Sequence, residues 1–335
     1  MTGLTFLLVA MLLLILVAAE LFTDALEHLG EKLAISEGVT GSLFAAVGTA
    51  LPETFVPLLA IFAGTSDAHV NQEIGVGAIL GAPLMLSTLT MGLLGLTAFG
   101  RRGISGRIQP ESTGVKRDLN FFLFAFTVAA AAMWVPTELK IVRAVLSVFL
   151  ICTYVVYVGM TLRASGKLVS GGHGTRARRP MVLARLGLST TWATILIQLI
   201  GATLLLLIGA KEFIVGVNGV AERLGISALL LSLLVVPIAT ELPEKVNSIL
   251  WIRKDRDTLA VGNITGAMVF QGTLLPAMGI LLTPWQPRIE VLGGAGITLV
   301  AAFWLRLNVR KGGLPVAALV VNVALYASYL WLTLA

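Results

Sequence analysis

The chain has 335 residues, of which 57% are hydrophobic and only 13% are charged. Because soluble domains carry roughly 25% charged residues, this composition excludes an ordinary soluble domain and indicates an integral membrane protein. The net charge of +6 does not indicate a nucleic-acid partner, since the basic residues lie in loops between apolar runs and no basic-aromatic patch accompanies them. The single cysteine, Cys152, excludes an intrachain disulfide.

We predict ten membrane-spanning helices, because ten apolar runs approach or exceed the roughly 20 residues that cross a bilayer. The first run is expected to be a retained helix rather than a signal peptide, since no Lys or Arg precedes it. Several runs are long enough to favour tilted or broken helices. The predicted spans are 4–25, 38–63, 74–99, 119–135, 138–162, 190–221, 226–252, 258–282, 288–305 and 314–334.

The basic residues are distributed unequally between the two sets of connections that join these spans. If the N-terminus lies outside, eighteen of the 24 Lys and Arg residues fall in inner connections, and only Lys140, Arg223 and Arg288 fall in outer ones. Inner loops of membrane proteins carry the excess of Lys and Arg. We therefore expect a multi-pass protein of the cell (inner) membrane with both termini outside.

The chain divides into two halves of similar sequence. The longest break between spans, 164–188, contains the basic run GGHGTRARRP and is expected to be a cytoplasmic linker, either a solvated connector or a segment that touches anionic lipid head groups. A shift of 191 positions lays GTALPE, 48–53, on ATELPE, 239–244. Each half has an odd number of spans, so the second half is inverted, as in many secondary transporters. The predicted repeats are 1–163 and 189–335.

Each of these two motifs places a glutamate directly after a proline inside an apolar run. A carboxylate at that depth costs roughly 2.5 to 3.5 kcal/mol, so Glu53 and Glu244 indicate a functional site. The alternative is a buried acid neutralised by a proton or an arginine. Proline also frees the helix carbonyl four residues earlier, and at membrane depth that oxygen needs protein, water or a cation as its partner.

Further oxygen ligands accompany the two glutamates. Four-residue spacing puts Thr49 on the helix face of Glu53, and the same spacing puts Thr240 on the face of Glu244. Carboxylates, hydroxyls and carbonyls together suit a hard cation such as Ca²⁺ or Na⁺. The three histidines lie in predicted loops and lack the spacing of metal ligands.

Glycine-rich runs begin the helix after each motif, IGVGAILGA at 74–82 and VGNITGA at 261–267. Small residues at four-residue spacing let neighbouring helices approach closely, and packing alone explains them. Asn263, Thr265 and Gln271 add polarity to the second of these helices. We expect Asn263 and Gln271 to contribute to cation binding, and the alternative is that they form hydrogen bonds between helices.

In these features the sequence resembles the calcium/cation antiporter superfamily, whose best-known members are sodium/calcium exchangers. Members carry G-T-S-L-P-E on helices two and seven, each followed by a helix beginning near G-N-x-x-G-S-N, and the resemblance covers nearly the whole chain. It implies an all-α fold of two inverted five-helix repeats, with alternating access by sliding of the first helix of each half. It further implies that Glu53 and Glu244 are the main metal ligands. Thr49 and Thr240 would assist through hydroxyl or carbonyl oxygens.

The sequence departs from the family pattern chiefly in its first half. Ala50 and Glu241 replace the motif serines, and most oxygen ligands for separate Na⁺ ions are absent, chiefly from the first half. We expect Glu241 to be a further cation-binding residue. Lys245 follows it by four residues, in the order that favours an ion pair, and that pair would leave a formal charge of about −2 from Glu53 and Glu244. Alternatively, Lys245 reaches Glu244 and competes with the cation, or it snorkels or faces a water-filled crevice.

We therefore expect a secondary active cation antiporter that exchanges Ca²⁺ or a related cation for H⁺ rather than Na⁺. Proton coupling requires only that the two glutamates exchange a cation for protons, because desolvation raises a carboxyl pKa and a bound cation lowers it. The alternative is a diverged member that moves a monovalent cation, or a membrane sensor or partner protein. We expect no enzyme, since no HExxH motif or nucleotide-binding loop occurs, and no cofactor besides the transported cation. The expected partners are inorganic cations and the lipid bilayer.

Overall fold

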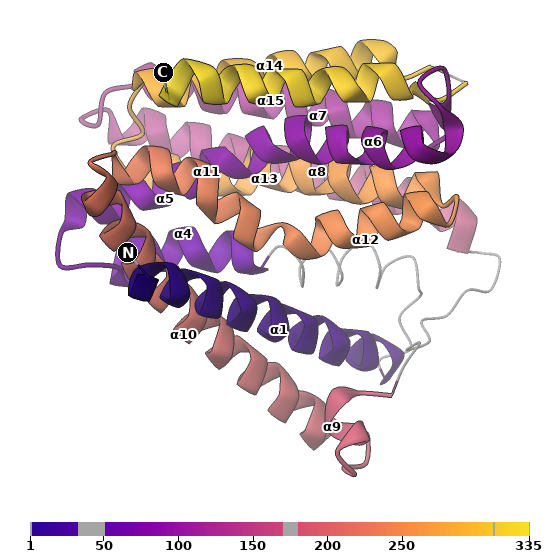
Figure 1. Ribbon diagram of the computed structural model, residues 1–335, viewed down its shortest axis with the longest axis horizontal. Coiled ribbons are helices and arrows are strands. Elements are labelled where there is room, and N and C mark those ends of the chain that lie inside the picture. The colour runs from indigo at the N-terminus through magenta and orange to yellow at the C-terminus, as the bar shows by residue number, and fades with distance from the viewer. Residues whose placement is uncertain (1, 33–50, 170–179, 311, 335) are drawn as a thin grey trace.

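The computed structural model describes residues 2–32, 51–169, 180–310 and 312–334, and these are mostly helical (Figure 1). Two shorter helical turns accompany the α-helices: a π-helical turn, Leu86–Thr90, and a 3-10 turn, Ala132–Trp134. The helices are α1 (Thr2–Lys32), α4 (Leu51–Ala63), α5 (Ala68–Met85), α6 (Met91–Arg102), α7 (Ser112–Ala131), α8 (Lys140–Val169), α9 (Val182–Arg185), α10 (Trp192–Leu224), α11 (Ala228–Thr240), α12 (Leu242–Arg253), α13 (Asp257–Leu282), α14 (Ile289–Asn308) and α15 (Val316–Leu334).

Within the described residues, helix is present at all ten predicted spans. α4 fills the described part of 38–63, and α11 and α12 together fill 226–252. α1 and α8 run past their predicted ends, because the polar residues there continue the helix instead of starting a loop. His28, expected in a loop, is therefore a buried residue of α1, and its Nδ1 lies 2.8 Å from the Asp24 carbonyl oxygen.

The bundle presents apolar side chains where a soluble protein would present polar ones. Among the described residues, six helices are long and apolar enough to cross a membrane. Large apolar side chains are exposed along α8 and α10, including Val145, Val155, Ile197 and Ile200. Contiguous apolar surface of this extent is unusual on a soluble monomer and fits contact with lipid. The chain is an integral, multi-pass membrane protein.

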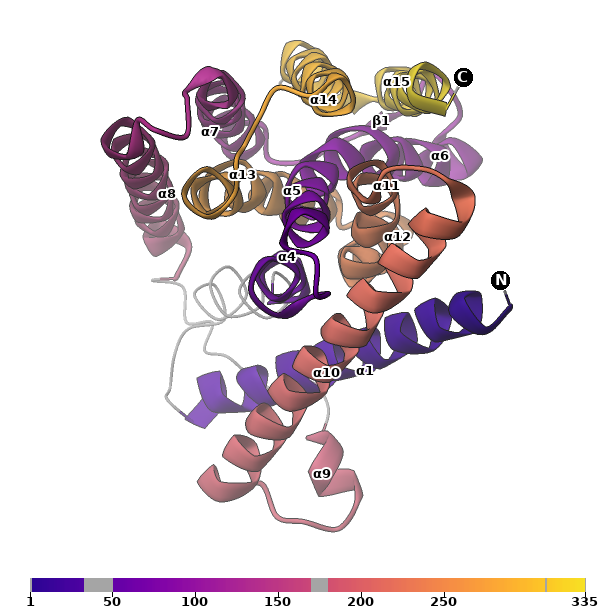
Figure 2. The same cartoon turned by 90° about the vertical axis from the view of Figure 1, so that its left-hand side faces the viewer.

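Three helices, α5, α11 and α13, lie in the middle of the bundle (Figure 2). α7 and α8 cover one side, α14 and α15 lie on another, and α1 and α10 cross along a third (Figure 2). One buried apolar core is shared mainly by α5 to α8 and α13 to α15. A second core is shared by α1, α4, α5, α10 and α11. α5 contributes to both cores and so connects the two parts of the bundle.

α5 and α11 approach each other so closely that two positions on α5 admit only glycine. A Cβ on Gly77 would lie 1.8 Å from the Ser232 hydroxyl oxygen and 2.6 Å from the Leu229 carbonyl oxygen. A Cβ on Gly81 would lie 2.2 Å from the Leu233 carbonyl oxygen. The glycine run therefore serves close packing between the two halves, as predicted from its four-residue spacing.

Polar contacts tie the two halves together at the end of the bundle where α6 ends and α13 begins. The Arg102 guanidinium donates to Asp257 at 2.7 Å and to Asp255 at 2.8 Å. The hydrogen bond from Arg102 holds the pKa of Asp255 below its usual range. Beside this ion-pair cluster, β1 (Arg107–Ile108) pairs antiparallel with β2 (Leu314–Pro315). This short ladder is the one departure from the all-α prediction among the described residues.

We expect Gly81→Ala to lower the thermal midpoint of the detergent-purified protein by several degrees, because the new methyl group meets a backbone carbonyl that cannot move independently. Overpacking of this kind costs about 1 to 3 kcal/mol. Gly201→Ala in α10 is the matched control, since a Cβ there meets nothing within 4 Å. An equal midpoint for both variants would show that α5 and α11 are not in close contact.

Candidate functional site

The first carboxylate of the candidate site is inside the protein. Glu53 lies in the first turn of α4 and is 3% exposed. α4 packs against α5 where a Cβ on Gly75 would lie 2.6 Å from Ile61 and 3.4 Å from the Pro57 carbonyl oxygen. A short connection joins these two helices, which run antiparallel, so Glu53 lies about one helical turn or more beyond Gly75 along α5.

The second motif interrupts its span, as predicted. α11 ends at Thr240, Glu241 has φ −93° and ψ 6°, and α12 begins at Leu242. The Glu241 N–H donates to the Pro237 carbonyl at 3.2 Å, and the Glu241 carbonyl accepts from the Lys245 N–H at 3.1 Å. Thr240 is 2% exposed and donates its hydroxyl to the Val236 carbonyl at 3.2 Å. The Thr240 hydroxyl oxygen keeps lone pairs that can accept a hydrogen bond or coordinate a cation.

Glu241 and Lys245 form the ion pair that their spacing predicts. The Lys245 ammonium lies 3.4 Å from a Glu241 carboxylate oxygen, and the two side chains are 7% and 0% exposed. The ammonium also donates to the Pro237 carbonyl at 3.0 Å and lies 2.7 Å from the Met85 sulfur on α5. Because Lys245 is enclosed by protein, the predicted alternative in which it snorkels or faces a water-filled crevice is wrong.

The two amides predicted on α13 differ in their surroundings. Gln271 is 2% exposed, and its side-chain oxygen has no hydrogen-bond partner among the described residues. Asn263 donates to the Ser248 hydroxyl at 3.2 Å and so links α13 to α12. The hydrogen bond between helices, which was the alternative for Asn263, is therefore present. Gln271 retains a free acceptor, which a cation or a water molecule can use.

Two of the predicted ligands lie outside the part of the chain that the structure describes. Thr49 belongs to residues 33–50, and the side chain of Glu244 is not among those described, although its backbone belongs to α12. The expected convergence of Glu53 and Glu244, and the alternative contact of Lys245 with Glu244, therefore stay predictions. The described members are Glu53, Thr240, Glu241, Lys245, Asn263 and Gln271.

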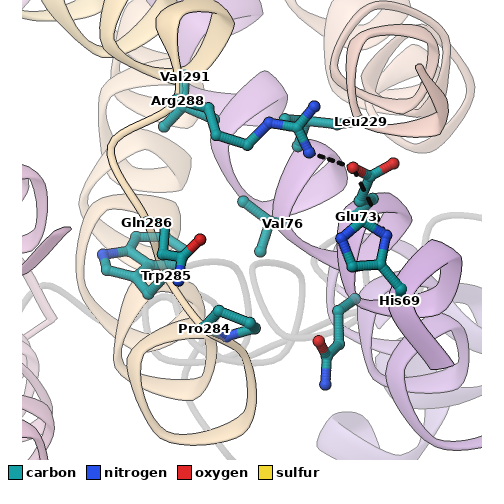
Figure 3. Close-up of a pocket in the computed structure, with 10 residues that line it drawn as sticks. His69, Glu73, Val76, Leu229, Pro284, Trp285, Gln286, Arg288 and Val291 are labelled. Carbon is teal, nitrogen blue, oxygen red and sulfur yellow. Dashed lines mark hydrogen bonds and ion pairs between the residues drawn. The ribbon is translucent and has the colours of Figure 1, made fainter. Parts of the chain in front are cut away.

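A pocket opens at one end of α5, beside α11 and the connection from α13 to α14 (Figure 3). In it, Arg288 forms an ion pair with Glu73, and His69 lies 3.9 Å from the same carboxylate (Figure 3). Val76 and Trp285 supply apolar walls. Glu73 precedes the glycine run directly, which is the signal that could have marked it, but its arginine partner is more than 200 residues away in sequence.

A further buried carboxylate, Asp118 in α7, was not predicted from the sequence. It is 5% exposed and accepts from the Thr265 hydroxyl at 2.8 Å and the Tyr157 hydroxyl at 3.2 Å, with Arg117 at 3.4 Å. These contacts join α7 to α8 and α13. Asp118 follows Lys116 and Arg117 in a charged stretch just before a predicted span, so the sequence favours a solvated helix end there.

The comparison with protein families gives one match that covers most of the chain. The model described as "Sodium/calcium exchanger protein" matches residues 3–163 and 194–335. The putative antiporter CaxA of Alkalimonas amylolytica is 26% identical over 92% of this chain and 90% of that protein. The inner membrane protein YrbG of Escherichia coli (strain K12) is 25% identical over 84% of this chain and 81% of that protein.

Two solved structures have the same fold as this chain. The crystal structure of the H⁺/Ca²⁺ exchanger CAX superposes with a TM-score of 0.68 and 17% identity, covering 99% of this chain and 86% of that one. A structure of the sodium-calcium exchanger NCX_Mj gives 0.58 and 20% identity, covering 96% and 95%. The likeness confirms the predicted fold of ten helices in two inverted repeats. The named functions are exchange and antiport, in agreement with the expectation of a transporter rather than an enzyme.

We expect the Asp118 contacts to stabilise the fold cooperatively. Asp118→Leu and Thr265→Val should each lower the free energy of unfolding, because each leaves a buried polar partner without its hydrogen bond, at about 1 to 3 kcal/mol. The double variant should lose less than the sum of the two, with a coupling of about 1 kcal/mol or more. Unfolding by denaturant in detergent measures the cycle. Additive losses would mean that the contact does not contribute.

Proposed function

Because the chain belongs to the sodium/calcium exchanger family, we propose that it is a secondary active cation antiporter that exchanges Ca²⁺ or a related cation for H⁺ by alternating access. The observation that carries this proposal is a pair of buried acids at the helix motifs of the two halves. Glu53 is 3% exposed on α4, and Glu241 is fully buried at the break between α11 and α12. A charged side chain at such depth is costly and is retained where an ion must bind.

In the proposed site, Glu53 and Glu244 bind the cation, with Thr49 and Thr240 as supporting oxygens. The acceptor on Gln271 can complete the shell, whereas Asn263 is already engaged with Ser248. Ca²⁺ takes six to eight oxygen ligands in flexible geometry, and its affinity rises with the number of carboxylates. The helix break at Glu241 adds backbone carbonyls at the same level, which membrane proteins tolerate only inside protein or beside a cavity.

The charge of the site favours H⁺ as the exchanged ion. The Glu241–Lys245 ion pair contributes no net charge, so Glu53 and Glu244 leave a formal charge of about −2 when ionised. One Ca²⁺ or two protons neutralise that charge completely. Removal of the divalent cation leaves two buried carboxylates without a compensating charge, so protons can replace the cation without any further binding site.

The packing of α1 on α10 supports a sliding mechanism for alternating access. These helices lie against each other across one side of the bundle (Figures 1 and 2). Glycines of α10 face aliphatic side chains of α1, with Cβ positions at Gly209 and Gly216 falling 3.0 Å from Ile15 and 2.8 Å from Leu8. Small residues let these two helices pack closely, so in the proposed mechanism the pair moves as one unit relative to the rest of the bundle.

We expect Glu53→Gln to abolish cation exchange, since the amide keeps the size of the side chain but loses its charge. Purified protein in liposomes should accumulate ⁴⁵Ca²⁺ when a pH gradient is imposed, and Glu53→Gln should reduce the initial rate by about 100-fold, a loss of about 2.7 kcal/mol in transition-state stabilisation. The control is Glu138→Gln, at an exposed residue just before α8 begins, which should transport like the wild type. Uptake by Glu53→Gln at the wild-type rate would contradict the proposal.

The same liposomes distinguish the two candidate counter-ions. A pH gradient without Na⁺ should support Ca²⁺ uptake, and an Na⁺ gradient at equal pH on both sides should not. A response to Na⁺ alone would contradict proton coupling while leaving cation exchange in place.

The second candidate function is a diverged family member that moves a monovalent cation or acts as a membrane sensor. The observation that favours it is Lys245, a basic side chain that is 6% exposed at the candidate site. Calorimetric titration of Ca²⁺ into the purified protein separates the two. Equal affinity in the wild type and Glu53→Gln would favour the second candidate, and loss of binding in Glu53→Gln supports the first.

We further propose that the protein lies in the inner membrane with both termini outside. In a Cys152→Ser background, a membrane-impermeant maleimide should label Glu138→Cys in intact cells that express the protein. Leu186→Cys, inside the predicted linker, should react only after the membrane is permeabilised. The reverse labelling pattern would invert the orientation.

A further inference from the structure

Lys245 has the surroundings of a bound cation. Its ammonium is enclosed by a carboxylate oxygen of Glu241 at 3.4 Å, the Pro237 carbonyl oxygen at 3.0 Å and the Met85 sulfur at 2.7 Å. Two of these groups flank the break between α11 and α12, and the third comes from α5 in the other half of the chain. The positive charge therefore sits where the backbone is interrupted and where the two halves meet.

A contribution to stability alone does not explain this ion pair. Glu241 is fully buried and the Lys245 side chain is 7% exposed, so both charges have lost their water. Desolvation of a buried pair offsets much of its attraction, and apolar side chains in place of such pairs are often neutral or stabilising. A single carboxylate left alone at this depth is much more costly. The lysine is therefore a partner that supplies the compensating charge for a third acid at the site.

We propose that Lys245 is a tethered monovalent cation, which occupies a position that an alkali cation would otherwise fill and so makes transport independent of Na⁺ and K⁺. This inference rests on the proposed function and specifies its ion requirement. The lysine satisfies the Glu241 carboxylate and the Pro237 carbonyl permanently, because it cannot leave the site. Without its ammonium, Glu241 and the carbonyls at the break form an oxygen-lined position of the kind that hard monovalent cations occupy.

The test uses Lys245→Ala, which removes the charge and leaves room for an ion, and the double variant Glu241→Gln/Lys245→Ala, which removes both charges. The thermal midpoint of each purified protein is measured at pH 8.5 in choline chloride and then with added NaCl or KCl at constant ionic strength. The wild type and the double variant should show no difference between salts. Lys245→Ala should be stabilised by Na⁺ or K⁺ in a saturable manner.

The liposome assay gives the second readout. Uptake of ⁴⁵Ca²⁺ driven by a pH gradient should be the same in choline and Na⁺ for the wild type. Lys245→Ala should transport slowly in choline and recover by about tenfold or more in Na⁺ or K⁺, which corresponds to about 1.4 kcal/mol or more. Lys245→Arg keeps a positive charge and should remain independent of the salt. The Lys245→Arg variant also shows whether the salt dependence of Lys245→Ala arises from loss of the charge rather than from any change at this residue.

The possible results separate the two proposals. If Lys245→Ala matches the wild type in choline by both readouts, or responds to no alkali cation, the tethered-cation proposal is overturned. If Lys245→Ala does not fold in any salt while the double variant folds, the lysine serves only to neutralise Glu241, and the proposal is likewise overturned. If the wild type moves no Ca²⁺, the proposed function fails, but the thermal midpoints still decide the role of Lys245.

Discussion

The structure depends on how the interruption between α11 and α12 is satisfied. Inside a bilayer no water is present to bond a freed backbone group, so a broken helix persists only where protein surrounds the break. Here the Glu241 N–H still reaches the Pro237 carbonyl, and the Lys245 ammonium donates to the same oxygen. Lys245 also neutralises the Glu241 carboxylate. The break is thereby held in a defined shape, with its backbone and side-chain groups bonded within the protein.

The close contact of α5 with α11 brings that break against the other half of the chain. Gly77 and Gly81 allow the α5 backbone to touch the Leu229 and Leu233 carbonyls, and Met85, one turn further along, contacts Lys245. The other face of α5 packs on α4, which carries Glu53. One small-residue helix thus connects the acid of the first half to the break of the second. One extra methyl group at Gly77 or Gly81 would push α5 away from α11. These two glycines therefore position the site and also allow the helices to pack closely.

Most of the fold could be predicted from sequence because the bilayer restricts it. Every span must be apolar, long and internally hydrogen-bonded, and these requirements are local properties that a chain displays directly. The ten spans, the helix break and the Glu241–Lys245 ion pair follow from such local patterns. The predicted positions of the helix ends were less accurate, since α1 and α8 continue through polar residues that could equally form a loop.

The contacts that the sequence did not reveal join residues far apart in the chain. Asp118 meets Thr265, and Glu73 meets Arg288, and in each pair at least one member lies outside the repeated motifs. No spacing rule relates residues that meet only because helices from different halves pack together. The environment of Lys245 was foreseen only in part for the same reason. Its partner four residues away was predictable, whereas Met85 on α5 was not.

The charge of the proposed site gives a physical reason why exchange of a cation for protons would be obligatory. An antiporter must allow the protein to change conformation when loaded and hinder the change when empty. In a low-dielectric interior, uncompensated charge is costly to move, so a site of charge −2 is mobile when it holds one Ca²⁺ or two protons and is held back when it holds neither. A third unpaired carboxylate would shift this balance and leave the Ca²⁺-loaded state charged. In the proposed site, the charge of Lys245 would offset that of Glu241 and keep both loaded states close to neutral, which is the condition under which a divalent cation and protons can share one pathway.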